Sequence, residues 1–186
     1  VNRWIEENEC DASAIQCWTS VQDNYGCATC LSMSMLSERL MPSACEVDVA
    51  GAISMYALAL ASGAPPALLD WNNNYGDAED KLILFHCGSC AQSLMTKKGT
   101  VTSHKMFDKG DPGSGWGTNE GRIRPFKTTI SNCLTVDGKI KIYASEAEFT
   151  DDPIEDAYFG CAGVCQIPNM EDKMIRLARG GFKHHT

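Results

Sequence analysis

The sequence is organised around one long apolar run, SACEVDVAGAISMYALALASGAPP, at residues 43–66. Ser43 and Glu46 have the spacing of a capping box, in which two side chains satisfy free backbone amides at a helix start. We therefore expect a helix over residues 47–61, ended by Gly63 and two prolines. The run is apolar on nearly all sides, which predicts a buried helix within an α/β layer.

The residues after this helix predict strands. Residues 68–71 and 82–85 are short apolar runs, each followed by polar residues. From residue 122 to 149, apolar and polar residues alternate around Asp137-Gly138, a dipeptide that favours a type I′ hairpin turn. We expect an α+β chain, with an α/β lobe over residues 1–65 and a mostly antiparallel, barrel-like β lobe over residues 66–186.

The composition is that of a globular protein, with 186 residues, 44% apolar and 22% charged. The net charge of −8 opposes binding to phosphate backbones, so we expect no nucleic-acid partner. We expect no membrane span either, because such a helix needs about 20 predominantly apolar residues. The chain opens at Val1 without a signal segment, which favours a cytoplasmic location.

Ten cysteines are present. In a cytoplasmic chain of this length we expect them to be buried, reduced thiols. Two C-x-x-C pairs leave a zinc or redox interpretation open. The pairs are Cys27/Cys30 and Cys87/Cys90, and the gap between them is longer than a zinc ribbon uses. Structural thiols are therefore the favoured interpretation.

Acidic and imidazole side chains stand at the ends of the predicted buried elements: Glu46, Asp70, His86, His184 and His185. A buried carboxylate is costly unless it is paired, hydrogen-bonded or metal-bound. Together these groups suit Mn²⁺ or Mg²⁺. The residues alone leave other roles open. Glu46 can close the capping box, Asp70 can stabilise a turn, and His86 can be a hydrogen-bonded core histidine.

Several segments, in one order, resemble the L-fucose/L-arabinose isomerase superfamily, in its L-fucose isomerase-like branch. They are PSACEVDVAGA at 42–52, DWNNNY at 70–75, FHC at 85–87, FTDDP at 149–153, IPN at 167–169 and GFKHH at 181–185. Family members are considerably longer, so the resemblance implies a carboxy-terminal part. Residues 1–65 would end a Rossmann-like domain, and residues 66–186 would form the β-rich C-terminal isomerase domain.

The resemblance also implies a metal centre. In that family a Glu, an Asp about two dozen residues later and a distant His hold a divalent metal, usually Mn²⁺, with Mg²⁺ or Co²⁺ as alternatives. Glu46 and Asp70 are 24 residues apart, and the C-terminal motif places the histidine ligand at His184. His86 matches a further ligand of the arabinose branch. His185 is implied as a neighbour of the metal, with coordination by His185 instead left open.

The implied reaction interconverts an aldose and a ketose, a pentose or deoxyhexose, through a cis-enediol. Glu46 and Asp70 would be both ligands and the acid/base pair, so Glu46 could not serve the helix cap. The residues implied to contact the sugar are Trp71, Asn73, Tyr75 and His185. The resemblance further implies a homo-oligomer for the full-length protein.

Two other interpretations remain beside the isomerase. The chain could be a non-catalytic sugar-binding or oligomerisation module. It could also be a thiol–zinc protein, with the metal held by Cys27, Cys30, Cys87 and Cys90.

Overall fold

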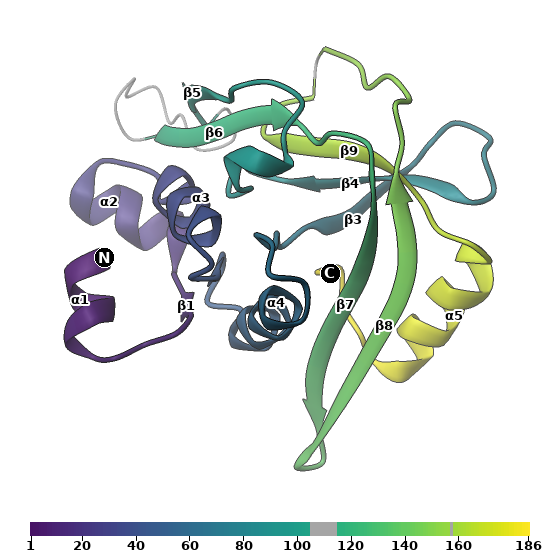
Figure 1. The fold of residues 1–186 in the computed structure, drawn as a ribbon, viewed down its shortest axis with the longest axis horizontal. Helices are drawn as coiled ribbons and strands as arrows, with labels where there is room; N and C mark the ends of the chain where they lie inside the picture. The colour runs from purple at the N-terminus through teal and green to yellow at the C-terminus, as the bar shows by residue number, and fades with distance from the viewer. Residues whose placement is uncertain (105–114, 157) are drawn as a thin grey trace.

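A computed structural model describes residues 1–104, 115–156 and 158–186. Short helices and two short strands form the N-terminal region (Figure 1). They are α1 Asn2–Glu7, β1 Ser13–Ala14, the π-helix η1 Cys17–Val21, α2 Gln22–Tyr25, α3 Cys30–Glu38 and β2 Ser43–Ala44. β1 and β2 pair in parallel, so the chain returns beside its own start just before Glu46.

A seven-stranded, mostly antiparallel sheet forms the second region. Its strands are β3 Asp70–Asn74, β4 Lys81–His86, β5 Thr100–Ser103, β6 Trp116–Arg122, β7 Phe126–Val136, β8 Lys139–Phe149 and β9 Cys161–Gln166, with the 3₁₀ turn η2 Gln92–Leu94 after β4. The main order is β3-β4-β9-β6-β5, and the β7–β8 hairpin joins through β8 and β9. The expected α+β class and antiparallel pairing are confirmed.

The barrel-like arrangement is not found among the described strands. β9 pairs with β6 at residues 161–162 and with β8 at residues 165–166, both on the side away from β4. The sheet therefore divides at β9 instead of curling onto itself. The predicted hairpin is confirmed, because Asp137 and Gly138 have φ of 50° and 72°. A last helix, α5, covers Met170–Gly180.

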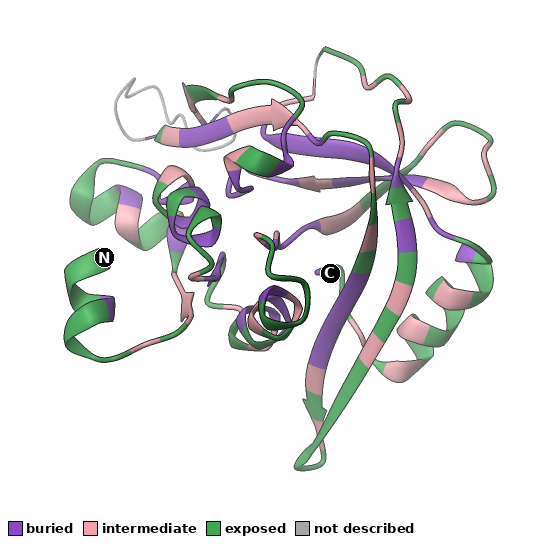
Figure 2. Cartoon of the chain, viewed as in Figure 1, coloured by how far each residue is buried: buried purple, intermediate pink, exposed green. Residues whose placement is uncertain are grey.

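Helix α4 spans Val49–Ser62 and ends at Gly63, as predicted, in the left-handed conformation. The capping-box prediction is wrong, because Ser43 belongs to β2 and the Asp48 side chain caps the helix instead. Full burial is also wrong. Figure 2 shows both buried and exposed residues along α4. Its exposed apolar residues are Val49, Ile53 and Leu60.

The core has three clusters. One lies within the sheet around Leu84 and Phe149, and a smaller one contains Ile83 and Val164. The third joins the N-terminal helices and α4, and it also includes Leu68 and reaches Cys87. Packing therefore crosses residue 65, and the division into lobes stays a prediction. Among the described helices, none has the length and apolar character needed to cross a membrane.

The expectation of reduced thiols fails at one pair. Cys90, just after β4, is disulfide-bonded to Cys161 at the start of β9. Both residues are fully buried. β4 and β9 are hydrogen-bonded neighbours, with His86 opposite Cys161, so strand pairing brings the two sulfurs together. The other cysteines are free thiols, of which Cys27 is exposed.

Candidate metal centre

The C-terminal residues of the chain extend the sheet edge at β3. Leu69 donates its amide to the Thr186 carbonyl at 2.9 Å, and the Thr186 amide returns a bond to Leu69 at 2.7 Å. The Trp71 amide donates to His184 at 2.9 Å. This antiparallel pairing places His185 directly opposite Asp70, although the two are far apart in sequence.

Glu46 reaches the same place through an unusual backbone. Glu46 and Val47 both adopt the left-handed conformation, with φ of 60° and 57°. This is uncommon for any residue other than glycine, and for a β-branched valine it is strained. The two residues turn the chain between β2 and α4. The turn places Glu46 Oε2 at 3.7 Å from His185 Nε2.

The predicted acidic and histidine residues converge. Asp70 Oδ1 lies 3.4 Å from His185 Nε2 and 3.5 Å from His184 Nε2. Ligand atoms of Glu46, His184 and His185 lie within 4.8 Å of one another, as do those of Asp70, His86 and His185. The structure therefore gathers all five residues around His185, as one group of two carboxylates and three imidazoles.

Two facing atoms of this group lack hydrogen-bond partners. Asp70 Oδ1 and His185 Nε2 are buried, and neither has a hydrogen-bond partner among the described residues. Buried polar atoms are almost always satisfied, so such a facing pair favours a cation on these atoms, either a proton or a metal ion. A carboxylate oxygen and an imidazole nitrogen are both cation donors. The donor set therefore fits a divalent metal.

The electrostatics of the group follow from burial and charge. Burial raises the pKa of Asp70, and the Glu46 carboxylate adds to this, although His185 and His184 oppose it. Burial would lower the pKa of His185. However, its hydrogen bond to Asp48 and the charges of Asp70, Asp48 and Glu46 outweigh burial and raise it. Excess negative charge around His185 thus favours a cation, either a proton or a metal.

The two final histidines differ in burial. The His184 side chain is 57% exposed, whereas that of His185 is 8% exposed. Both rings lie near Asp70 Oδ1, but only His185 forms the backbone bridge to Asp70, and its ring is the buried one. The buried histidine is therefore His185. The resemblance implied His184 as the ligand, with His185 as a neighbour of the metal or an alternative ligand.

His86 approaches from β4, and its two ring nitrogens differ. Nδ1 accepts the Cys87 amide at 2.9 Å, while the buried Nε2 has no partner among the described residues. Burial lowers the pKa of His86 to about 3, with the other histidines adding to the effect, so the ring is neutral. Its proton then belongs on Nε2. His86 in this state has an Nε2–H that can donate a hydrogen bond, and coordination through Nε2 would require the other tautomer.

Asp48 belongs to the site and was missed by the sequence reasoning. Its Oδ2 lies 2.7 Å from His185 Nδ1. Burial would raise the pKa of Asp48, but the bonds from His185 and the Gly51 amide outweigh it and lower the pKa. A usable signal was present, since an Asp directly before an apolar helical run is a strong N-cap candidate.

The predicted sugar contacts lie in different places. Trp71 follows Asp70 on β3, is partly buried and packs on the main core cluster. Asn73 is exposed on the same strand. Tyr75 packs with the small cluster around Ile83, and its hydroxyl donates to the Pro153 carbonyl. Their contacts with a substrate stay a prediction.

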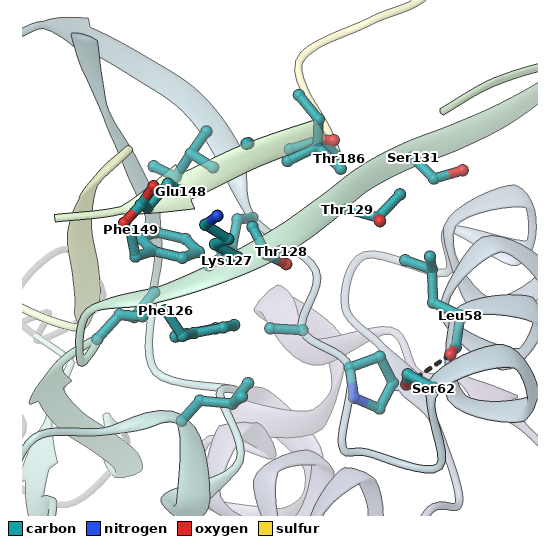
Figure 3. Close-up of a pocket in the computed structure, with 18 of the residues that line it drawn as sticks. Leu58, Ser62, Phe126, Lys127, Thr128, Thr129, Ser131, Glu148, Phe149 and Thr186 are labelled. Carbon is teal, nitrogen blue, oxygen red and sulfur yellow. Dashed lines mark hydrogen bonds between the residues drawn. The ribbon is translucent and has the colours of Figure 1, made fainter. Parts of the chain in front are cut away.

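A cavity of about 780 Å³ lies between α4 and the β7–β8 hairpin. Figure 3 shows Leu58 and Ser62 on one side and Thr129 and Ser131 of β7 on the other, with Thr186 also in the wall. Its lining residues include neither carboxylate of the metal group nor any histidine. The cavity therefore adjoins the site through Thr186 without containing it.

The predicted four-thiolate set does not assemble, because Cys90 is in the disulfide and Cys27 is exposed. Buried thiols do gather nearby. Cys17 and Cys45 sulfurs are 2.8 Å apart, and those of Cys30 and Cys87 are 3.6 Å apart. Hydrogen bonding and burial raise the pKa of the Cys30 and Cys45 thiols, which favours their protonated form.

The chain is similar to curated isomerases. It is 35% identical over 188 residues to proteins named sulfoquinovose isomerase from Priestia aryabhattai and Priestia megaterium, and each alignment covers 100% of this chain. A protein of that name from Alkalicoccus urumqiensis is 38% identical over 95 residues, which cover 50% of this chain. No protein-family model matches. The chain spans 40% of the length of the two Priestia relatives, so over its whole length it is similar to one section of an isomerase.

Proposed function

We propose that this chain carries the metal centre of an aldose–ketose isomerase that acts on sulfoquinovose. The observation that carries the proposal is the buried Asp70–His185 pair, 3.4 Å apart, in which both facing atoms lack a hydrogen-bond partner among the described residues. Glu46, at 3.7 Å from the same His185 nitrogen, completes a donor set suited to Mn²⁺, Mg²⁺ or Co²⁺. The name shared by the relatives supports the reaction and the sugar.

The proposed ligands are Glu46, Asp70 and His185, with His184 at the exposed rim. A metal bound there supplies Lewis-acid stabilisation of the negative charge that develops on the sugar oxygens at C1 and C2. His86 contributes its Nε2–H as a hydrogen-bond donor to a sugar oxygen, because its Nδ1 is occupied by the Cys87 amide.

The carboxylates supply the acid/base chemistry. One carboxylate oxygen removes the C2 proton of the open-chain aldose and returns it to C1, while O2 loses a proton and O1 gains one. In this proposal Asp70 is the carboxylate that accepts and releases this proton. Glu46, which is exposed, exchanges the hydroxyl proton in this proposal.

The sugar is a sulfonated one in this proposal. Sulfoquinovose is glucose with a sulfonate in place of the 6-hydroxyl, so its C1–C2 chemistry is that of an ordinary aldohexose. The family resemblance implied a pentose or an unsubstituted deoxyhexose, and either would undergo the same reaction at C1 and C2. The protein can tell these sugars from sulfoquinovose only by its contacts with the other atoms of the sugar. We further propose that the complete protein is a cytoplasmic homo-oligomer.

The test supplies the protein that contains this chain with Mn²⁺ and offers sulfoquinovose, L-fucose or L-arabinose. NMR spectroscopy follows formation of the ketose. We expect conversion of sulfoquinovose and its loss in Asp70→Asn, while Asp77→Asn, an exposed carboxylate in the next turn, retains activity. Conversion of L-fucose or L-arabinose alone would contradict the assigned sugar, and no ketose from any of the three would contradict the isomerase.

A further inference from the structure

The second ring nitrogen of His185 has a dedicated partner. Nδ1 lies 2.7 Å from Asp48 Oδ2, and the His185 side chain is only 8% exposed. A carboxylate can only accept a hydrogen bond, so Nδ1 carries the proton of this contact. In the neutral ring Nε2 is then the unprotonated nitrogen, and it faces Asp70 Oδ1 at 3.4 Å and Glu46 Oε2 at 3.7 Å.

Asp48 is itself held in place from the other side. Its Oδ1 accepts a hydrogen bond from the Gly51 amide at 2.8 Å, and this bond caps the N-terminus of α4. Gly51 also leaves room for this arrangement, because a Cβ there would lie 2.5 Å from Asp48 Oδ2 and 2.8 Å from Leu68 Cδ1. The carboxylate therefore joins a helix start to an imidazole through two separate oxygens.

We propose that Asp48 is a positioning residue of the metal centre, which fixes the ring orientation and tautomer of His185 so that Nε2 is presented to the metal. This inference rests on the proposed function, since it concerns the same metal. A partner on the second nitrogen of a metal-binding histidine orients the ring and raises its basicity, and its loss typically weakens metal binding about 10–100-fold.

The decisive variant is Asp48→Asn. The amide oxygen can still accept the Gly51 amide, so the helix cap remains, but the amide NH₂ now faces His185 Nδ1. That group donates, so Nδ1 must accept and the ring proton moves to Nε2, where it blocks coordination. The matched control is Asp48→Ser, because serine also caps helices well but does not reach the ring to impose the wrong tautomer.

Two measurements separate this inference from the proposed function. Nitrogen NMR of the metal-free protein, at a pH where the ring is neutral, should show the Nδ1–H form of His185 in the wild type and the Nε2–H form in Asp48→Asn. Calorimetry should show Mn²⁺ binding at least about tenfold weaker in Asp48→Asn than in the wild type, with Asp48→Ser between them. Thermal unfolding of the metal-free variants should stay close to wild type.

An Nε2–H form in the wild type, or equal Mn²⁺ affinity in wild type and Asp48→Asn, would overturn the positioning role. The expected tautomers without any Mn²⁺ binding would instead overturn the proposed metal centre, while supporting the role of Asp48 in orienting the ring. Failure of the two ideas is thus distinguishable in the same set of proteins.

Discussion

Asp70 and His185 face each other across an antiparallel bridge at the edge of the sheet. The flanking bonds between Leu69 and Thr186 fix this register. A shift of this pairing by one residue would place His184 instead of His185 opposite Asp70. Both imidazoles reach Asp70, and the backbone pairing of the last residues makes His185 the buried one and leaves His184 largely exposed.

Replacing Asp70 by Asn should abolish metal binding without harming the metal-free fold. Burial raises the pKa of Asp70, so its ionised form is disfavoured in the folded chain and a neutral amide of the same shape should be tolerated. We expect Mn²⁺ affinity to fall by more than about 100-fold, beyond the effect of losing an outer partner. Calorimetry measures the affinity, and thermal unfolding in EDTA measures the fold.

The matched control is Asp77→Asn, which removes an exposed carboxylate in the turn after β3. This variant changes the net charge by the same amount as Asp70→Asn. We expect both the Mn²⁺ affinity and the thermal unfolding in EDTA to stay at the wild-type values. Equal loss of Mn²⁺ affinity in both variants would mean that general electrostatics, and not coordination by Asp70, governs binding.

His86 should make the metal-free protein sensitive to acid. Its pKa is lowered from 6.5 to about 3 by burial, so between these values the unfolded chain takes up a proton that the folded chain does not. Stability is therefore lost as pH falls from 6.5 toward 3, by up to roughly 4 kcal/mol from this group. Urea unfolding at a series of pH values measures the loss.

The informative variant is His86→Asn, whose side-chain oxygen can replace Nδ1 as acceptor of the Cys87 amide. It should flatten the stability profile between pH 6.5 and about 4. His185, whose pKa is raised, acts in the opposite sense and loses its contribution as pH rises, so it cannot mimic the effect. Parallel profiles in wild type and variant would show that His86 is not responsible.

Local features of the fold were predictable, because local chemistry determines them. Asp137-Gly138 forms the hairpin turn because both positions have positive φ, and Gly63 ends α4 for the same reason. The course of β9 was not predictable. It pairs with β4, β6 and β8, and no local pattern in Cys161–Gln166 encodes three distant partners.

The site was predicted in part. Glu46, Asp70 and the histidines were identified by their residue types and by resemblance, and the structure brings them together. The capping role was given to Ser43 and Glu46, because the spacing of a capping box is a local rule. Parallel pairing of Ser43 with Ser13 overrides that rule, so the cap passes to Asp48 and Glu46 faces the histidines.

The left-handed backbone at Val47 should carry a measurable cost. A β-branched residue at φ 57° is strained, whereas glycine adopts this conformation freely. Val47 is 47% exposed, so little burial is lost when its side chain is removed. We expect Val47→Gly to stabilise the protein by about 0.5–1 kcal/mol, after allowance for the flexibility that glycine adds to the unfolded chain.

The control is Val49→Gly at the start of α4, where the same change should destabilise by up to about 1 kcal/mol, because the backbone there is helical. Chemical denaturation of both variants gives the two free energies. Destabilisation of similar size in both would show that Val47 is not strained.

The Cys90–Cys161 disulfide should contribute strongly to stability. It closes a loop with a sequence separation of 71, and in the chain-entropy account a cross-link of this length stabilises by about 4 kcal/mol. Double replacement by alanine should therefore lower the midpoint of urea unfolding under non-reducing conditions, and a reducing agent should lower the wild-type midpoint to a similar value.

The control is Cys27→Ala, which removes an exposed free thiol and should leave the midpoint unchanged with or without the reducing agent. If the reducing agent leaves the wild type unaffected while mass spectrometry finds both thiols free beforehand, the cross-link does not form in the protein. β4 and β9 are then held by their hydrogen-bonded register alone.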